Sequence, residues 1–212
     1  MKKLILSAIV ATFSIAAIVP QAGSQPKSGR EKLGIRIGFV EPESDIENAF
    51  GDGSGLALHF TERIKPPLFI EIALAAIYLG ESKTDEITEL LFGPGVSDAN
   101  MRIINITLGP TIEIPLGERR IFYISSGIGL YSISVLLEMG LFGSDISQEH
   151  FGAQVGAGIY WPLTDNWKLD VNFTAHHIRT AEETSDIFYL YSAGDSDPNF
   201  YQFSIGASYS LN

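Results

Sequence analysis

The stretch FGAQVGAGIYWPLTDNWKLDVNFTAH, residues 151–176, contains two segments in which apolar residues occupy every second position, separated by a Pro-Leu-Thr-Asp-Asn turn. A period of two is typical of a β-strand with one apolar face. The turn predicts that the two strands form a hairpin, in which we expect Gly158 to face Asp170 and Tyr160 to face Lys168. The pattern alone does not say whether the apolar face contacts a protein core or lipid, and this distinction decides the class of protein.

The same alternation recurs along the chain and predicts an all-β protein. We expect strands at about 33–41, 54–64, 67–80, 101–115, 119–134, 149–163, 166–178 and 198–211. Most of these segments are longer than an ordinary strand but suit a tilted strand that crosses a bilayer. The even number of strands favours an eight-stranded antiparallel up-and-down transmembrane β-barrel.

The connections between the expected strands alternate in length. Three are short, at 65–66, 116–118 and 164–165, and four are long, at 42–53, 81–100, 135–148 and 179–197. Outer-membrane barrels have short turns on the periplasmic side and long loops outside the cell. The alternation therefore predicts that both termini lie in the periplasm.

The face opposite the apolar one distinguishes a membrane barrel from a soluble one. A soluble barrel would carry Lys and Glu there, whereas here Gly, Ser, Thr and Asn dominate, and such side chains suit a narrow lumen. Trp161 and Trp167 flank the turn on the apolar face, where a membrane would place them at the headgroup level. A soluble lipocalin-like barrel, with these aromatic residues in its core, remains the alternative.

The N-terminal residues have the layout of a secretory signal peptide. Lys2 and Lys3 precede the apolar run LILSAIVATFSIAAIV, and small residues follow Pro20. We expect a signal peptide over 1–24, with cleavage after Ser24, and a single outer-membrane β-barrel domain over 25–212. An N-terminal membrane anchor is the alternative.

Composition excludes several classes of protein. The chain has no cysteine, so no disulfide framework stabilises it. Its formal net charge is −11, and loss of the two leader lysines leaves 12 basic and 25 acidic residues, a charge of −13. This balance argues against a nucleic-acid partner.

Three segments carry a resemblance to a known family: GIRIGFVEP near the start, the hairpin GAQVGAGIYWPLTDNWKLDV, and the final strand FYQFSIGASYSLN. They resemble the small eight-stranded outer-membrane barrels of the porin family, of the OmpA-transmembrane, OmpX and OmpW kind. The resemblance implies a bacterial outer-membrane location, with outer-membrane lipid, lipopolysaccharide and the barrel-assembly machinery as partners.

The candidate site residues are the polar and charged residues at strand positions that face the lumen. Two roles are open for this lumen polar network: a gated ion or proton path, or a polar plug whose charges pair because water is scarce there. We favour the plug, because eight strands enclose little more than side chains. The network consists of His59, Arg63, Glu71, Asn105, Glu113, Lys168, Asp170 and His176.

We expect no catalytic, cofactor-binding or metal site. His176 and His177 invite comparison with the outer-membrane lipid A deacylases, but the run AHHIRTAEE lacks the Ser-Asn that follows the histidine in those enzymes. Two adjacent histidines are also too few ligands for a metal site. A lipid A-modifying enzyme is therefore the least favoured hypothesis.

The long connections differ in character. Several are acidic, and their carboxylates are either simply solvated or hold divalent cations against lipopolysaccharide phosphates. The segments VLLEMGLFG (135–143) and DIFYLY (186–191) are apolar, and we interpret them either as strand extensions or as a surface patch for a hydrophobic or host ligand. The sequence favours a structural or cell-surface interaction protein; the alternative is a narrow OmpW-like channel for small hydrophobic molecules.

Overall fold

The computed structural model describes residues 30–43, 47, 50–80, 98–117, 120–139, 142–179 and 198–211. The expected signal peptide, the segment DIFYLY and most of the acidic connections lie outside these ranges. Across the ranges described, no helix is long and apolar enough to cross a membrane.

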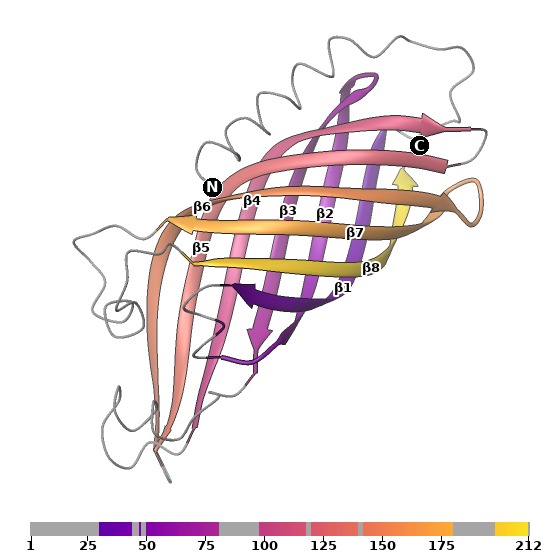
Figure 1. Ribbon diagram of the computed structural model, residues 1–212. Helices are drawn as coiled ribbons and strands as arrows, with labels where there is room; N and C mark the ends of the chain where they lie inside the picture. The colour runs from indigo at the N-terminus through magenta and orange to yellow at the C-terminus, as the bar shows by residue number, and fades with distance from the viewer. Residues whose placement is uncertain are drawn as a thin grey trace.

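The described residues form a closed antiparallel barrel in which every strand pairs with its neighbours in the sequence (Figure 1). The strands are β1 Glu31–Glu43, β2 Gly53–Lys65, β3 Leu68–Leu79, β4 Asp98–Leu116, β5 Arg120–Met139, β6 Phe142–Pro162, β7 Trp167–Arg179 and β8 Asn199–Leu211. The eight-stranded up-and-down barrel is therefore confirmed. We call the end of the barrel with the turns at 66–67 and 163–166 the short-turn end, and the opposite end the long-loop end.

The barrel closes where the first strand meets the last. Pairing between β1 and β8 is continuous from Glu31 opposite Leu211 to Glu43 opposite Asn199. At Gly206 the two backbones are so close that a Cβ atom would lie 2.0 Å from the carbonyl oxygen of Ile35. Glycine therefore permits the close approach of the two strands at the closure.

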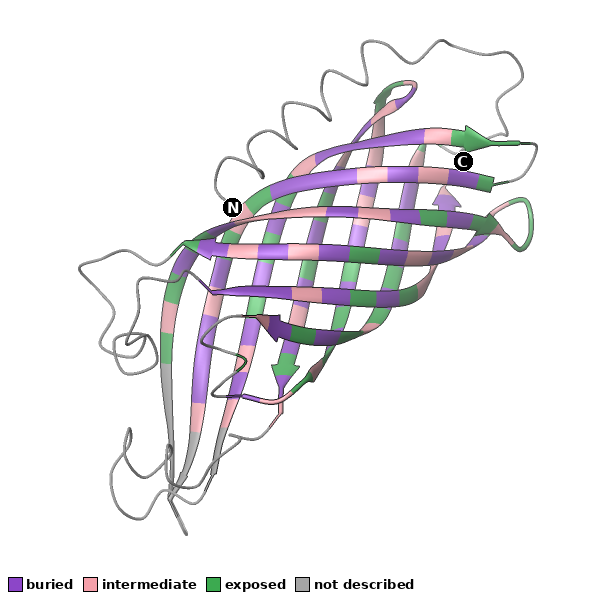
Figure 2. Cartoon of the chain, in the orientation of Figure 1, coloured by how far each residue is buried: buried purple, intermediate pink, exposed green. Residues whose placement is uncertain are grey.

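Many apolar side chains point out of the barrel, and several charged side chains point into it. Ile37 and Phe203 are 60 % and 55 % exposed, whereas Lys32 and Asp170 are completely buried. Figure 2 shows buried and exposed residues alternating along the strands. A soluble barrel would have the opposite arrangement, because water favours charges outside. The predicted direction of the apolar face is confirmed.

The third connection is not the long loop that the sequence predicted at 135–148. Strands β5 and β6 continue through this segment and remain paired as far as Met139 opposite Phe142. The apolar run VLLEMGLFG does not alternate, so its periodicity could not reveal a strand. The strand-extension interpretation is confirmed for the described residues of this segment, and β4, β5 and β6 reach beyond the other strands at the long-loop end (Figure 1).

The hairpin of β6 and β7 has a wider turn than the sequence suggested. Residues 163–166 form the turn, in which Leu163 N–H donates to the Trp167 carbonyl over 2.8 Å. Tyr160 consequently lies opposite Asp170, and the expectation that it faces Lys168 was wrong by two residues. A shift of two residues leaves every side chain on the same face of the sheet. Trp161 and Trp167 therefore remain on the outer surface, each about half exposed.

Candidate functional site in the barrel lumen

Strand β1 supplies two long basic side chains to the lumen. Lys32 and Arg36 share the inward parity with Gly34 and Gly38. A Cβ atom at Gly34 would lie 2.2 Å from the His59 ring, so the glycine leaves room for that ring to lie across the lumen. Alternation of glycine with a long side chain is what lets a narrow barrel contain complete basic residues.

Arg36 is the centre of an ionic layer across the lumen. Its Nε donates to the Asp170 Oδ2 atom over 2.6 Å, and its guanidinium lies 3.6 Å from a Glu71 carboxylate oxygen. Tyr123 O–H donates to the other Asp170 oxygen over 2.6 Å and accepts a hydrogen bond from Arg36 over 3.2 Å. His59 Nε2 lies 3.6 Å from Asp170 Oδ2. We define the ionic layer as Arg36, His59, Glu71, Tyr123 and Asp170.

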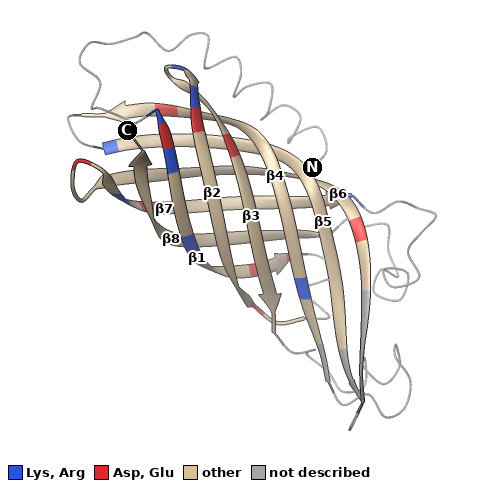
Figure 3. Cartoon of the chain, turned by 180° about the vertical axis from the view of Figure 1, so that it is seen from behind, with Lys and Arg blue, Asp and Glu red and all other residues tan. Residues whose placement is uncertain are grey.

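A second buried ion pair lies nearer the short-turn end. Lys32 pairs with Glu113 on the opposite side of the lumen. Lys168 is also inward and only 4 % exposed, and Arg63 is half-buried. Figure 3 shows that the charged residues of β2 and β3 gather toward this end.

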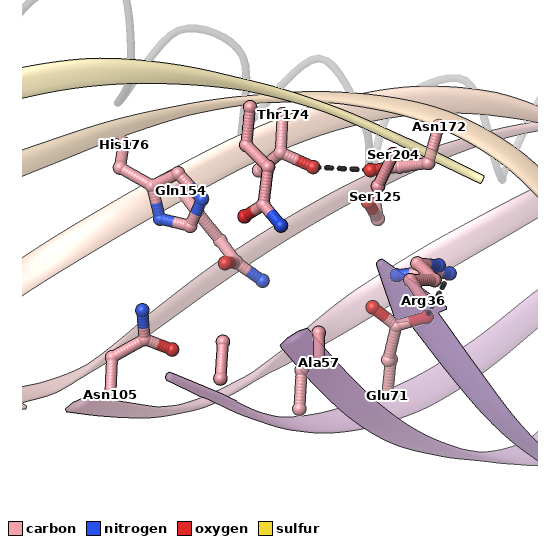
Figure 4. A pocket seen from close by; sticks show the side chains of 13 residues that line it. Arg36, Ala57, Glu71, Asn105, Ser125, Gln154, Asn172, Thr174, His176 and Ser204 are labelled. Atoms are coloured by element: carbon pink, nitrogen blue, oxygen red, sulfur yellow. Dashed lines mark hydrogen bonds and ion pairs between the residues drawn. The ribbon is translucent and has the colours of Figure 1, made fainter. Parts of the chain in front are cut away.

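A small polar cavity adjoins the ionic layer on the side of the long-loop end, and Figure 4 shows the side chains that line it. It has room for about one or two water molecules. The Nδ2 atom of Asn105 is buried there without a hydrogen-bond partner among the described residues. The residues that line the cavity include Arg36, Glu71, Asn105, Gln154, Thr174 and His176.

The lumen becomes apolar at the long-loop end. His176 lies at the boundary: its Nδ1 is 3.2 Å from the Tyr131 hydroxyl, and its ring stacks on Phe200 with centroids 4.3 Å apart. The sequence did not indicate this change, because here the inward positions are as apolar as the outward ones. We define the apolar layer as Val40, Phe50, Ile77, Leu79, Met101, Ile103, Tyr131, Ile133, Val135, Ile178 and Phe200.

The structure divides the eight candidate residues among three levels. His59, Glu71 and Asp170 meet in the ionic layer; Asn105 and His176 line the cavity together with Glu71; Glu113, Lys168 and Arg63 lie nearer the short-turn end. The sequence prediction omitted three residues that organise these groups, namely Lys32, Arg36 and Tyr123. Their inward direction was readable, since each has at least one outward apolar neighbour in its strand.

The two adjacent histidines do not form a joint site. His176 points into the lumen and is 4 % exposed, whereas His177 has the opposite parity and its Nδ1 lies 2.7 Å from the Asn199 Oδ1 atom. Within the described ranges, no group of three or more metal-ligating side chains could hold a metal ion.

Comparison with known proteins places the whole barrel in one family. A family model described as "outer membrane protein beta-barrel domain" matches residues 7–210. No curated protein matches the chain.

Solved structures share its fold at low sequence identity. Neisserial surface protein A aligns with a TM-score of 0.61 at 13 % identity, covering 85 % of this chain and 97 % of its own. A major outer membrane protein of Thermus thermophilus aligns at 0.57 and 14 % identity, covering 84 % and 98 %. OprG of Pseudomonas aeruginosa aligns at 0.51 and 15 % identity, covering 89 % and 100 %.

Proposed function

Because the chain belongs to the family of outer-membrane protein β-barrel domains, we propose that it is a closed barrel that acts at the bacterial cell surface. In this proposal the short-turn end and both termini face the periplasm, and the long-loop end faces the medium. Membrane lipid and lipopolysaccharide surround the apolar outer face, and the barrel-assembly machinery inserts the chain. The polar lumen has a structural role and carries out no catalysis.

The observation that carries the proposal is the filling of the lumen at two levels. The ionic layer and the apolar layer each consist of buried side chains contributed by several strands. Removing contacts of the ionic layer would leave buried charges without counter-charges, which costs folding free energy. Removing side chains of the apolar layer would leave a cavity, which also costs folding free energy. A filled lumen supports a structural role more than solute passage.

The extension formed by β4, β5 and β6 supports an interaction role. Residues 142–150 of β6 pair with β5, and pairing of β6 with β7 begins only at Phe151. Among the described strands, none pairs with the other edge of this segment. Such an edge can add an extended strand from a host or surface ligand.

Surface display can be tested with single cysteines, because the natural chain has none. We expect Ser147→Cys, on the exposed part of the β6 extension, to react with a membrane-impermeant maleimide in intact cells. The matched control Asp165→Cys, exposed in the turn at the short-turn end, should react only after the outer membrane is permeabilised. Labelling of Asp165→Cys but not Ser147→Cys in intact cells would reverse the proposed orientation.

A narrow channel for small hydrophobic molecules is the second candidate, and the apolar layer favours it. The layer gives the long-loop half of the lumen an apolar lining that a small hydrophobic solute could contact. A closed barrel predicts that liposomes containing the protein take up a small alkane-like dye no faster than empty liposomes. The double variant Phe200→Ala and Ile103→Ala, which opens the layer, should leave the rate unchanged because the ionic layer still blocks the lumen. Uptake by the natural protein that exceeds that of empty liposomes would favour the channel.

A further inference from the structure

Three basic side chains are gathered around two aromatic rings at the short-turn end. The Lys32 Nζ atom lies 4.3 Å from the Phe69 ring centroid and 5.0 Å from that of Tyr160. Arg63 shares the Phe69 ring, with its Cζ atom 5.5 Å from the centroid, and Lys168 shares the Tyr160 ring, with its Nζ atom 5.8 Å away. We call Lys32, Arg63 and Lys168 the basic cluster.

Within this cluster, Lys168 has no carboxylate partner among the described residues. Glu113 pairs with Lys32, while Glu71 and Asp170 pair with Arg36 in the ionic layer. The Lys168 Nζ atom is buried and has no hydrogen-bond partner among the residues that the structure describes. A buried ammonium group without a partner is costly, so this position favours the arrival of an anion.

Hydroxyl groups around the cluster are also without hydrogen-bond partners. The Thr61 Oγ1, Tyr160 Oη and Ser210 Oγ atoms are all buried and unpartnered within the described part of the chain. Thr61 and Ser210 are the cross-strand neighbours of Lys32, one on each side. Native proteins rarely leave so many donors unsatisfied in one place.

We propose that the basic cluster is a binding site for a phosphate-class oxyanion that enters from the short-turn end. Phosphate carries up to two negative charges and several strong acceptor oxygens, so one ion can accept hydrogen bonds from Lys168 and from neighbouring hydroxyls. Arg63 is half-buried where β2 approaches its turn, at the end from which the anion would enter. The site lies at the opposite end from the β4–β6 extension, so it goes beyond the proposed surface role and is independent of it.

The test uses the full chain refolded in a phosphate-free, non-ionic detergent. Sodium phosphate is titrated at constant ionic strength set with sodium chloride, and binding is measured from ³¹P line broadening and from the unfolding temperature. We expect saturable broadening and a raised unfolding temperature for the natural protein. Lys168→Met should weaken binding at least tenfold, whereas Lys65→Met, which removes an exposed lysine from the same end of the barrel, should bind as the natural protein does.

Phosphate effects no larger than those of chloride on the natural protein would overturn the proposal. Equal binding by Lys168→Met and Lys65→Met would overturn it as well. If Lys168→Met does not fold, Lys168→Arg, which keeps the charge, must retain binding and Ser210→Ala must weaken it. In a second arm, phosphatidylglycerol is added to the micelles: competition with phosphate assigns the site to a lipid headgroup, and absence of competition assigns it to the soluble ion.

Discussion

Replacing Arg36 with methionine is expected to lower the free energy of unfolding by about 3–5 kcal/mol, because the change leaves buried carboxylates without their counter-charge. Arg36 contacts both Asp170, which is completely buried, and Glu71, which is 5 % exposed. The measurement is urea unfolding of the reconstituted protein, followed by tryptophan fluorescence.

The matched control removes an arginine from the outer surface. Arg120 lies with its Cζ atom 3.9 Å from the Trp161 ring centroid, and Arg120→Met should cost no more than about 1 kcal/mol. Adding Asp170→Asn to Arg36→Met should recover part of the loss, since it removes one uncompensated charge. Equal losses for Arg36→Met and Arg120→Met would show that the ionic layer does not stabilise the barrel.

Replacing Ile106 with arginine is expected to destabilise the barrel in a bilayer by about 2–4 kcal/mol. Ile106 is 52 % exposed on the outer face and pairs with Leu74 near the middle of β3. Lipid would surround an arginine at that depth, whereas water around a soluble barrel would accept it at almost no cost. The measurement is the unfolding free energy of the variant and the natural protein in the same lipid vesicles.

The matched control places the same residue at the end of the barrel. Leu163 is 61 % exposed in the turn between β6 and β7, and Leu163→Arg should cost less than about 1 kcal/mol because the charge reaches the interface. If both arginine variants unfold like the natural protein, the outer face does not contact hydrocarbon.

Periodicity was sufficient to predict the barrel and the direction of its side chains. Alternation of apolar residues with small or polar residues depends only on the strand itself, so it can be read without knowing the neighbours. The same method failed at 135–148, where an apolar run continues as strand without alternating. It also misplaced the pairing of Tyr160, because the width of a turn sets the register and the sequence did not reveal that width.

The contacts inside the lumen were much harder to predict. Arg36 and Asp170 are 134 residues apart in the chain, and they meet because closure brings β1 near β7. Sequence parity shows that both side chains point inward, but not that one reaches the other across the lumen. The same limitation explains why Glu113 was expected in the network while its partner Lys32 was not.

The pairing of β1 with β8 has a consequence for biosynthesis. The first strand finds one of its partners only when the last strand has been made, so a chain that stops before Asn199 leaves open edges on two strands. Such a product is an open sheet, and other chains can add strands to its unpaired edges. Only chains that include β8 can therefore close the barrel and remove these edges.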